Sequence, residues 1–207
     1  MHLRWEIPHA DPMVLQTLLL GFTIGLVAVI PPGPVALSLI EVGVQQGRRG
    51  GAWGGVGVAG GDTVVASAAA GLVLMGGALP DRFFAGAQVV SGIVLVVLGM
   101  LVAARPDVTR GLARSITRPG RAFFVITALT PSVFGAWLAM IAAMPFAQEP
   151  GPVAAFVTGG MVASLGYHLV LGAGAGGLGA RLQPATLAWA SRLGGSAMVV
   201  FGVWTLT

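Results

Sequence analysis

The sequence predicts an all-α integral membrane protein with six transmembrane helices, of which the first and the fourth are broken. Its composition is far more apolar than that of a soluble domain, with 56% hydrophobic residues, 9% charged residues and a mean hydropathy of +0.89. The apolar residues fall in blocks long enough to cross about 30 Å of hydrocarbon. We therefore expect one transmembrane domain over residues 13–207, after a polar extension over residues 1–12.

Short connections that hold most of the charge separate the expected spans. In chain order, the spans are Met13–Val44, Ala52–Leu74, Phe84–Ala104, Phe123–Phe146, Val153–Gly176 and Leu187–Leu206. The extension contains Glu6 and Asp11, and no small-residue cleavage site precedes the first proline cluster. A signal peptide is therefore not expected, and Met13 is an alternative start.

Three prolines and a glycine interrupt the first span at Pro31, Pro32, Gly33 and Pro34. Bilayer hydrocarbon offers no water to unsatisfied backbone groups, so such a break needs shelter in protein or in a wet cavity. Broken membrane helices commonly form binding sites. Pro32, Gly33 and Pro34 are therefore candidate substrate-binding residues.

The fourth span has a similar interruption at Thr130, Pro131 and Ser132, which places a proline between two hydroxyls midway along it. Two interrupted spans, each opening a half of three spans, fit the pattern of a transporter built from two inverted repeats. Thr130, Pro131 and Ser132 are therefore also candidate substrate-binding residues.

Two acidic residues are expected at membrane depth. Counting from Arg48, Glu41 lies about 10 Å into the membrane, and Asp62, ten residues beyond Ala52, lies about 15 Å in on the same scale. An unpaired carboxylate there is costly, so each is expected to be protonated, paired or facing a polar cavity. Both are candidates for proton coupling. The structural alternatives are a hydrogen bond to a helix end for Asp62 and an ion pair with Arg48 or Arg49 for Glu41.

Span five has no acid equivalent to Asp62 and carries Ser164, Tyr167 and His168 instead. An intramembrane histidine is a candidate proton carrier or a partner for Asp62, and packing is the structural alternative. His168 is therefore the third candidate for proton coupling.

Arginine placement predicts the orientation of the chain in the membrane. The first, third and fifth connections, with the start of span six, hold nine arginines, against two in the N-terminus and the other connections. This positive-inside bias predicts that both termini lie outside the cell membrane. The nine are Arg48, Arg49, Arg105, Arg110, Arg114, Arg118, Arg121, Arg181 and Arg192. The arginines of the connection Arg105–Arg121 are interpreted as a cluster that sets the topology of the chain and faces anionic lipids. The alternative is a short helix at the membrane surface that includes Val108, Leu112 and Ile116.

Several classes of protein are excluded or disfavoured. There are no cysteines, so disulfides and thiolate metal sites are excluded. The segment Gly55–Gly60 spells the dinucleotide fingerprint, but it lies inside a span with no preceding strand. It is interpreted, like Gly172–Gly176, as a small-residue face that lets helices approach closely and would permit a homodimer. No cofactor, nucleic-acid partner or enzymatic activity is expected.

Three motifs follow one another along the first two spans, namely Pro32-Gly33-Pro34, then Gly47-Arg48-Arg49-Gly50-Gly51 and Gly60-Gly61-Asp62, and glycine pairs continue through spans three and six. In these motifs the chain resembles the lysine exporter (LysE/RhtB-type) family of translocators. The resemblance implies six spans, export of amino acids or similar small solutes, and coupling to the proton gradient. Where the family typically has Asn-Pro followed by lysine in span four, this chain has Thr130-Pro131 followed by Ser132. The substrate therefore stays open.

The expected function is a secondary transporter that exports an amino acid or a related small polar metabolite, by proton antiport. Two alternatives remain. Asp62, Glu41 and His168 offer oxygen and imidazole ligands, as in a divalent metal-ion exporter. The other alternative is a membrane assembly subunit that transports nothing.

Overall fold

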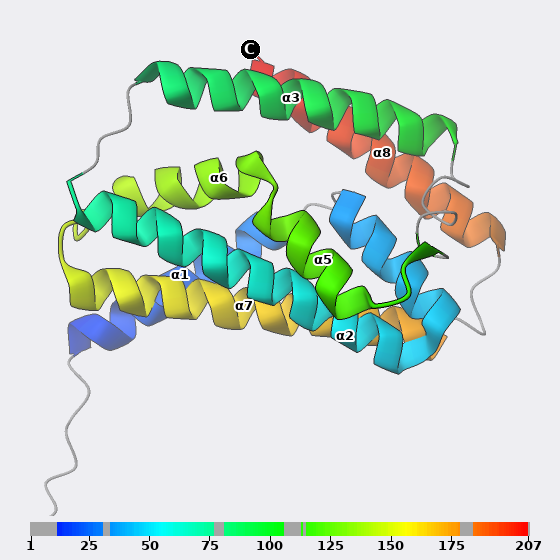
Figure 1. Ribbon diagram of the computed structural model, residues 1–207, viewed down its shortest axis with the longest axis horizontal. Helices are drawn as coiled ribbons and strands as arrows, with labels where there is room; N and C mark the ends of the chain where they lie inside the picture. Colours follow the sequence, from blue (N-terminus) through cyan, green and yellow to red (C-terminus); the bar gives the residue numbers. More distant parts are fainter. Residues whose placement is uncertain are drawn as a thin grey trace, which may run out of the picture.

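The protein is all-helical in its computed structural model, which describes residues 12–30, 34–76, 81–105, 113, 115–178 and 184–206. The helices are α1 (Pro12–Val29), α2 (Pro34–Leu74), α3 (Asp81–Ala104), α5 (Pro119–Ala128), α6 (Pro131–Ala142), α7 (Pro150–Leu178) and α8 (Pro184–Leu206) (Figure 1). The polar extension except Pro12, the residues Pro31, Pro32 and Gly33, and residues 106–112 and 114 of the Arg105–Arg121 connection lie outside the described residues.

Several of these helices are long enough to span a membrane. Three segments are long and apolar enough to cross a bilayer by themselves, namely α1, Val35–Leu74 of α2, and α7. The pair α5 and α6 qualifies as a fourth crossing if its bend of 61° is a break within one span. The protein is therefore a multi-pass helical membrane protein.

Proline sets where the helices begin. Six of the seven described helices start with a proline, and only α3 does not. Proline suits the first helical position because its fixed φ already matches the helix and the amide hydrogen it lacks would have no partner inside the helix. Most starts are thus encoded locally.

The first interruption separates α1 from α2. Helix α1 ends at Val29, Ile30 is not helical, and the chain becomes helical again at Pro34. Helix α2 then turns sharply at Gly47, whose φ of 73° and ψ of −177° are accessible essentially only to glycine. The arm of α2 after the turn thus starts at Arg48, four residues before the predicted start of the second span at Ala52, because the turn needs a single glycine rather than the whole Gly47–Gly51 segment.

The second interruption lies between α5 and α6 and confirms the predicted break at Pro131. Leu129 has φ −96° and ψ 5°, Thr130 has φ −86° and ψ 108°, and Pro131 starts α6. Proline disfavours the α conformation in the residue before it, which accounts for the extended Thr130. The result is the 61° bend.

Glycine allows the close helix contacts around α7. A Cβ on Gly55 would lie 2.6 Å from the carbonyl oxygen of His168, and one on Gly25 would lie 2.7 Å from the Cα of Gly160. Helices α1 and α2 therefore both rest on α7 backbone to backbone, as the predicted small-residue face requires. Helices α3 and α8 pair with each other in a separate layer at the top of Figure 1. Their contact uses Gly99, where a Cβ would lie 2.6 Å from the carbonyl oxygen of Gly195.

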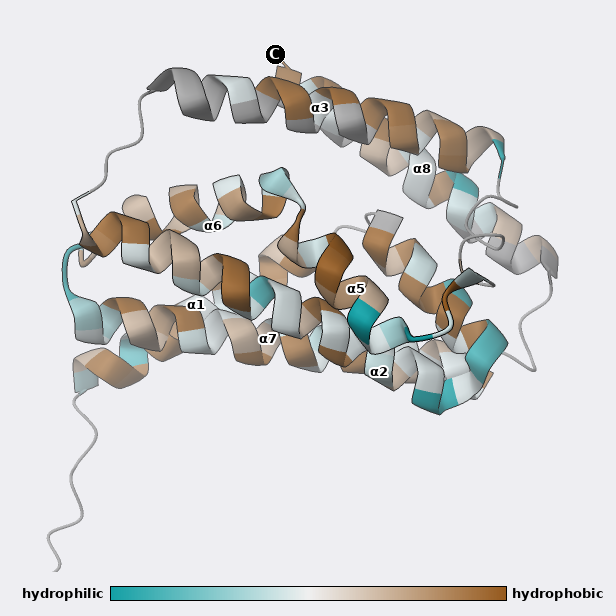
Figure 2. Ribbon diagram, viewed as in Figure 1, coloured by the Kyte–Doolittle hydropathy of each residue, from teal (hydrophilic) through white to brown (hydrophobic). Residues whose placement is uncertain are grey.

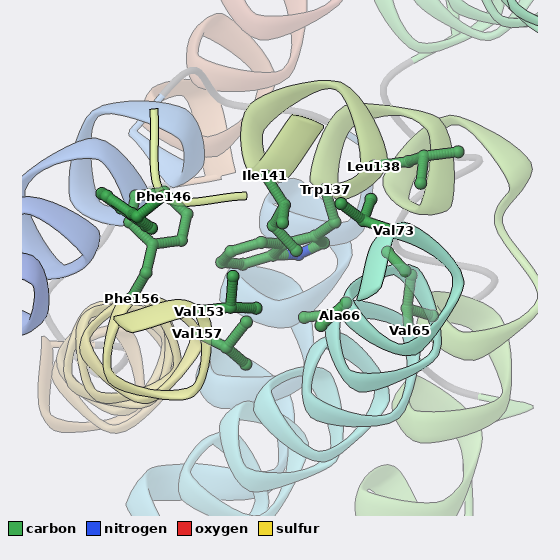
Figure 3. Close-up of a cluster of buried hydrophobic side chains, with 12 residues drawn as sticks. Val65, Ala66, Val73, Trp137, Leu138, Ile141, Phe146, Val153, Phe156 and Val157 are labelled. Carbon is green, nitrogen blue, oxygen red and sulfur yellow. The ribbon is translucent and has the colours of Figure 1, made fainter. Parts of the chain in front are cut away.

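Two clusters of buried apolar side chains form the core. The α6 cluster joins α2, α6 and α7 around the indole of Trp137 (Figure 3). It consists of Val65, Ala66, Ala69, Ala70, Val73, Trp137, Leu138, Ile141, Phe146, Val153, Phe156 and Val157. The α5 cluster consists of Leu39, Val42, Val58, Ala113, Ile116 and Phe123.

Hydrophobic residues predominate along most of the helices, and hydrophilic residues gather toward the two ends of the molecule. Figure 2 shows hydrophobic colouring over most helical lengths and hydrophilic colouring at the kink of α2 and the start of α5. The ends of α3 and α7 and the starts of α5 and α8 lie toward the same side of the molecule as the α2 kink (Figure 1). The starts of α1, α3 and α7 lie toward the opposite side.

Candidate functional site

A polar layer separates the two apolar clusters. On α2, Asp62 lies between Val58 of the α5 cluster and Val65 of the α6 cluster. On α7, Ser164 and His168 follow the last residue that α7 gives to the α6 cluster, Val157. All three polar side chains are buried, with exposed fractions of 6% for Asp62, 0% for Ser164 and 6% for His168.

A chain of hydrogen bonds joins these three residues. The hydroxyl of Ser164 donates to Oδ2 of Asp62 over 2.5 Å. Nδ1 of His168 lies 2.8 Å from the carbonyl oxygen of Ser164 and 3.2 Å from its hydroxyl oxygen. Since a carbonyl oxygen can only accept, Nδ1 carries the proton in this arrangement. The chain therefore runs from the imidazole through Ser164 to the carboxylate, and within the described part of the protein no arginine lies at ion-pair distance from Asp62.

The first helix break touches this layer through α7. The hydroxyl of Tyr167 donates to the carbonyl oxygen of Ile30, the residue that follows α1, over 3.3 Å. The ring of Tyr167 meets the imidazole of His168 edge-on, with centroids 5.1 Å apart. Ile30 is therefore linked to the hydrogen-bonded chain through two neighbouring side chains.

The second break approaches the layer from α5. A Cβ on Gly61 would lie 2.7 Å from the Cβ of Thr127 and 3.1 Å from the backbone nitrogen of Ala128, two residues before Thr130. The hydroxyl of Thr127 is buried and has no hydrogen-bond partner among the residues described. Thr130 donates its hydroxyl to the carbonyl oxygen of Ile126 over 2.6 Å. Asp62 and its neighbour Gly61 thus lie between the two breaks.

The remaining predicted residues lie elsewhere. Glu41 is buried, and its Oε2 accepts a hydrogen bond from the side-chain amide of Gln45 over 3.3 Å. Six and fifteen residues separate Glu41 and Asp62 from the turn at Gly47, which corresponds to about 9 Å and 22 Å along the helix axis. The comparable membrane depth of the two acids stays a prediction. Ser132 is half-buried in the first turn of α6.

The chain was compared with known protein families. The family model described as LysE type translocator matches residues 26–207. The chain belongs to the LysE type translocator family. No curated protein and no solved structure matches it in the same comparisons.

Membership identifies the translocator as a transport protein rather than an enzyme, and it implies amino-acid efflux and a small-molecule substrate. The match begins inside α1, at Leu26, and covers both breaks, Asp62 and His168.

Two residues of the translocator's polar layer were absent from the predicted set of site residues. Ser164 could have been found because it lies four residues before His168, which places both on one helical face. Thr127 carries no such signal, since its burial depends on the packing of α5 against Gly61.

The ligand set expected for a metal-ion exporter is not assembled in the described residues. No three side chains among their His, Asp and Glu residues are placed to hold an ion. Asp62 and His168 lie together, whereas Glu41 is on the short arm of α2 before Gly47.

Proposed function

We propose that the translocator is a proton-coupled secondary exporter of an amino acid or a related small polar metabolite, with Asp62 as the proton-exchanging group. The observation that supports this is a buried carboxylate, on a membrane-spanning helix, whose hydrogen-bond partner is the neutral hydroxyl of Ser164. A carboxylate in this setting is costly while charged, so taking up and releasing a proton alters the free energy of the polar layer.

His168 and Glu41 have supporting roles in this proposal. The imidazole of His168 orients the hydroxyl of Ser164 and offers a second site for a proton. Glu41 lies nearer the turn at Gly47 and provides a second carboxylate for a proton that passes between Asp62 and the arginine-rich end.

Substrate binds beside the polar layer, between the two breaks. Pro32, Gly33 and Pro34 contribute from the first break, and Thr130, Pro131 and Ser132 from the second. The amino end of α6 carries a partial positive charge that suits a carboxylate, whereas the carbonyl groups at the end of α5 suit an ammonium group. The contact of Gly61 with Thr127 supports this placement, since it holds the end of α5 against α2 next to Asp62.

The chain crosses the membrane six times in this proposal, in two inverted halves. Helix α1 with the short arm of α2 forms the first span, and α5 with α6 forms the fourth. Helices α3 and α8 complete the six, since their 24 and 23 residues correspond to about 36 Å and 35 Å.

Orientation gives a first test. Because Arg48, Arg49, Arg105, Arg118 and Arg121 all adjoin the kink of α2, the end of α3 or the start of α5, that end of the molecule faces the cytoplasm. A reporter active only outside the cytoplasm is expected to be active after Thr207 and inactive when it is inserted at Arg110. Activity of the insert rather than the terminal fusion would contradict six crossings with outward termini.

Transport itself is tested in liposomes that contain the purified protein. With an imposed pH gradient, at least one of a panel of acidic, basic and neutral amino acids is expected to move. Pro131→Leu should leave the protein inserted and remove this flux, because leucine allows α5 and α6 to join into one helix. The matched control is Pro150→Leu, at the exposed start of α7 and outside both breaks. Equal flux through both variants would mean that the break does not hold substrate, and no flux of any panel member would contradict amino-acid export.

A further inference from the structure

A second polar region lies at the arginine-rich end of the molecule, apart from the polar layer around Asp62. A cavity of about 480 Å³ opens between α2 and the start of α5. Its lining includes Arg49 and Trp53 from α2 and Arg118 and Arg121 from the α5 side. Residues more than sixty positions apart in the sequence thus form a single basic pocket.

The pocket is suited to an anion. All three of its arginines are exposed, and none has an acidic partner at ion-pair distance within the described ranges. The first turn of α5 contains no acidic residue, so the partial positive charge of this helix end is not offset from within that turn. Planar guanidinium groups also match the oxygen geometry of phosphate.

The helices that carry the arginines are held in fixed positions. The side-chain amide of Gln46 donates to the carbonyl oxygen of Ile116 over 2.7 Å, across one side of the pocket. Farther along α2, a Cβ on Gly57 would overlap the carbonyl oxygen of Gly120, so α2 and α5 are in direct backbone contact. The charged groups are therefore brought together before any ligand binds.

An apolar surface continues from the pocket toward the middle of the helices. Trp53 is 55% exposed, and Val56 follows it on the open face of α2. Phe124 and Val125 are exposed on the neighbouring α5. Tryptophan is favoured at the boundary between headgroups and hydrocarbon. A small free anion would make no contact with this apolar surface, whereas the acyl chains of a lipid could pack against it.

We propose that this pocket binds the phosphate group of an anionic phospholipid, whose acyl chains lie along Trp53, Val56 and Phe124. Phosphate oxygens contact Arg49, Arg118 and Arg121 and the start of α5. Basic pockets between helices on the cytoplasmic side of a membrane bind lipid headgroups in this way. The proposal is independent of the transported solute and of the proton-exchanging residue.

Native mass spectrometry of the purified full-length protein with added phosphatidylglycerol or phosphatidylcholine tests the proposal. Phosphatidylglycerol is expected to bind as a discrete adduct and phosphatidylcholine to bind much more weakly. Arg49→Gln and Arg121→Gln should each weaken phosphatidylglycerol binding by about fivefold, and the double variant by about 25-fold, if each arginine contributes about 1 kcal/mol. The control Arg192→Gln removes the same charge from α8, where Arg192 lies over Trp189, and should leave the affinity unchanged.

Two further measurements distinguish a lipid from a small phosphate and test the role of charge in the pocket. Glycerol phosphate at millimolar concentration should fail to displace the lipid, and displacement would assign the pocket to a small phosphate instead. The variant Arg49→Lys with Arg121→Lys should bind more tightly than the double glutamine variant and more weakly than the unchanged protein, because lysine preserves the charge but not the planar guanidinium group. Equal binding of both lipids, or equal losses in the Arg192→Gln control, would overturn the proposal.

Discussion

Asp62→Asn is expected to abolish export driven by a pH gradient while the protein remains folded. Asparagine has nearly the same shape, and its amide oxygen can still accept the hydrogen bond from Ser164, but it cannot take up or release a proton. Flux in liposomes under an imposed pH gradient should fall to the level of vesicles without protein. Solute exchange without a gradient should persist at a reduced rate, because exchange needs no net proton movement.

The matched control is Glu41→Gln, which makes the same chemical change on the short arm of α2. It is expected to lower the gradient-driven flux only partly, since Glu41 lies about 13 Å nearer the turn at Gly47 than Asp62 does. Full pH-driven flux through Asp62→Asn would exclude this carboxylate as the proton carrier. Loss of both driven flux and exchange, with an unfolded protein, would point to a structural role instead.

Gly51→Ala is expected to destabilise the fold strongly. The added methyl group would overlap the carbonyl oxygen of Gly172 and come within 3.0 Å of the Cα of Gly43, and backbone atoms cannot move aside as a flexible side chain can. Overpacking of this kind typically costs about 1–3 kcal/mol, and three packed segments meet at this point. Thermal unfolding in detergent should therefore begin at a clearly lower temperature.

Gly71→Ala provides the comparison on the same helix. A Cβ at Gly71 would meet no other atom within 4 Å, so this change is expected to raise helix stability by about 0.5–1 kcal/mol. Opposite signs for the two variants would confirm that Gly51 is required for close approach. Equal effects would mean that helix propensity alone determines the outcome.

The breaks and the buried acid could be predicted from the sequence because their signals are local. A proline inside an apolar run interrupts a helix wherever it occurs, as Pro131 does, and an aspartate such as Asp62 stands out in a span of apolar residues. The glycine faces that contact α7 were predicted on the same basis, from composition within one segment.

The partners of these residues could not be predicted, because they depend on how helices line up. Ser164 reaches Asp62 across 102 positions of sequence, and the pairing follows from the register of α2 against α7. The distance of Asp62 from the turn required knowledge that Gly47 alone makes the turn. The basic pocket likewise needed the contact between Gly57 and Gly120 to bring Arg49 beside Arg118.

Because of the bend between them, α5 contributes to one apolar cluster and α6 to the other. Phe123 of α5 belongs to one cluster and Trp137 of α6 to the other, with Leu129 and Thr130 as the joint between them. A straight helix in place of α5 and α6 would connect the two clusters along its length, as the arm of α2 from Arg48 to Leu74 does. With the joint, α2 still connects the clusters, but a shift of α5 is not carried into α6 by a continuous helical backbone.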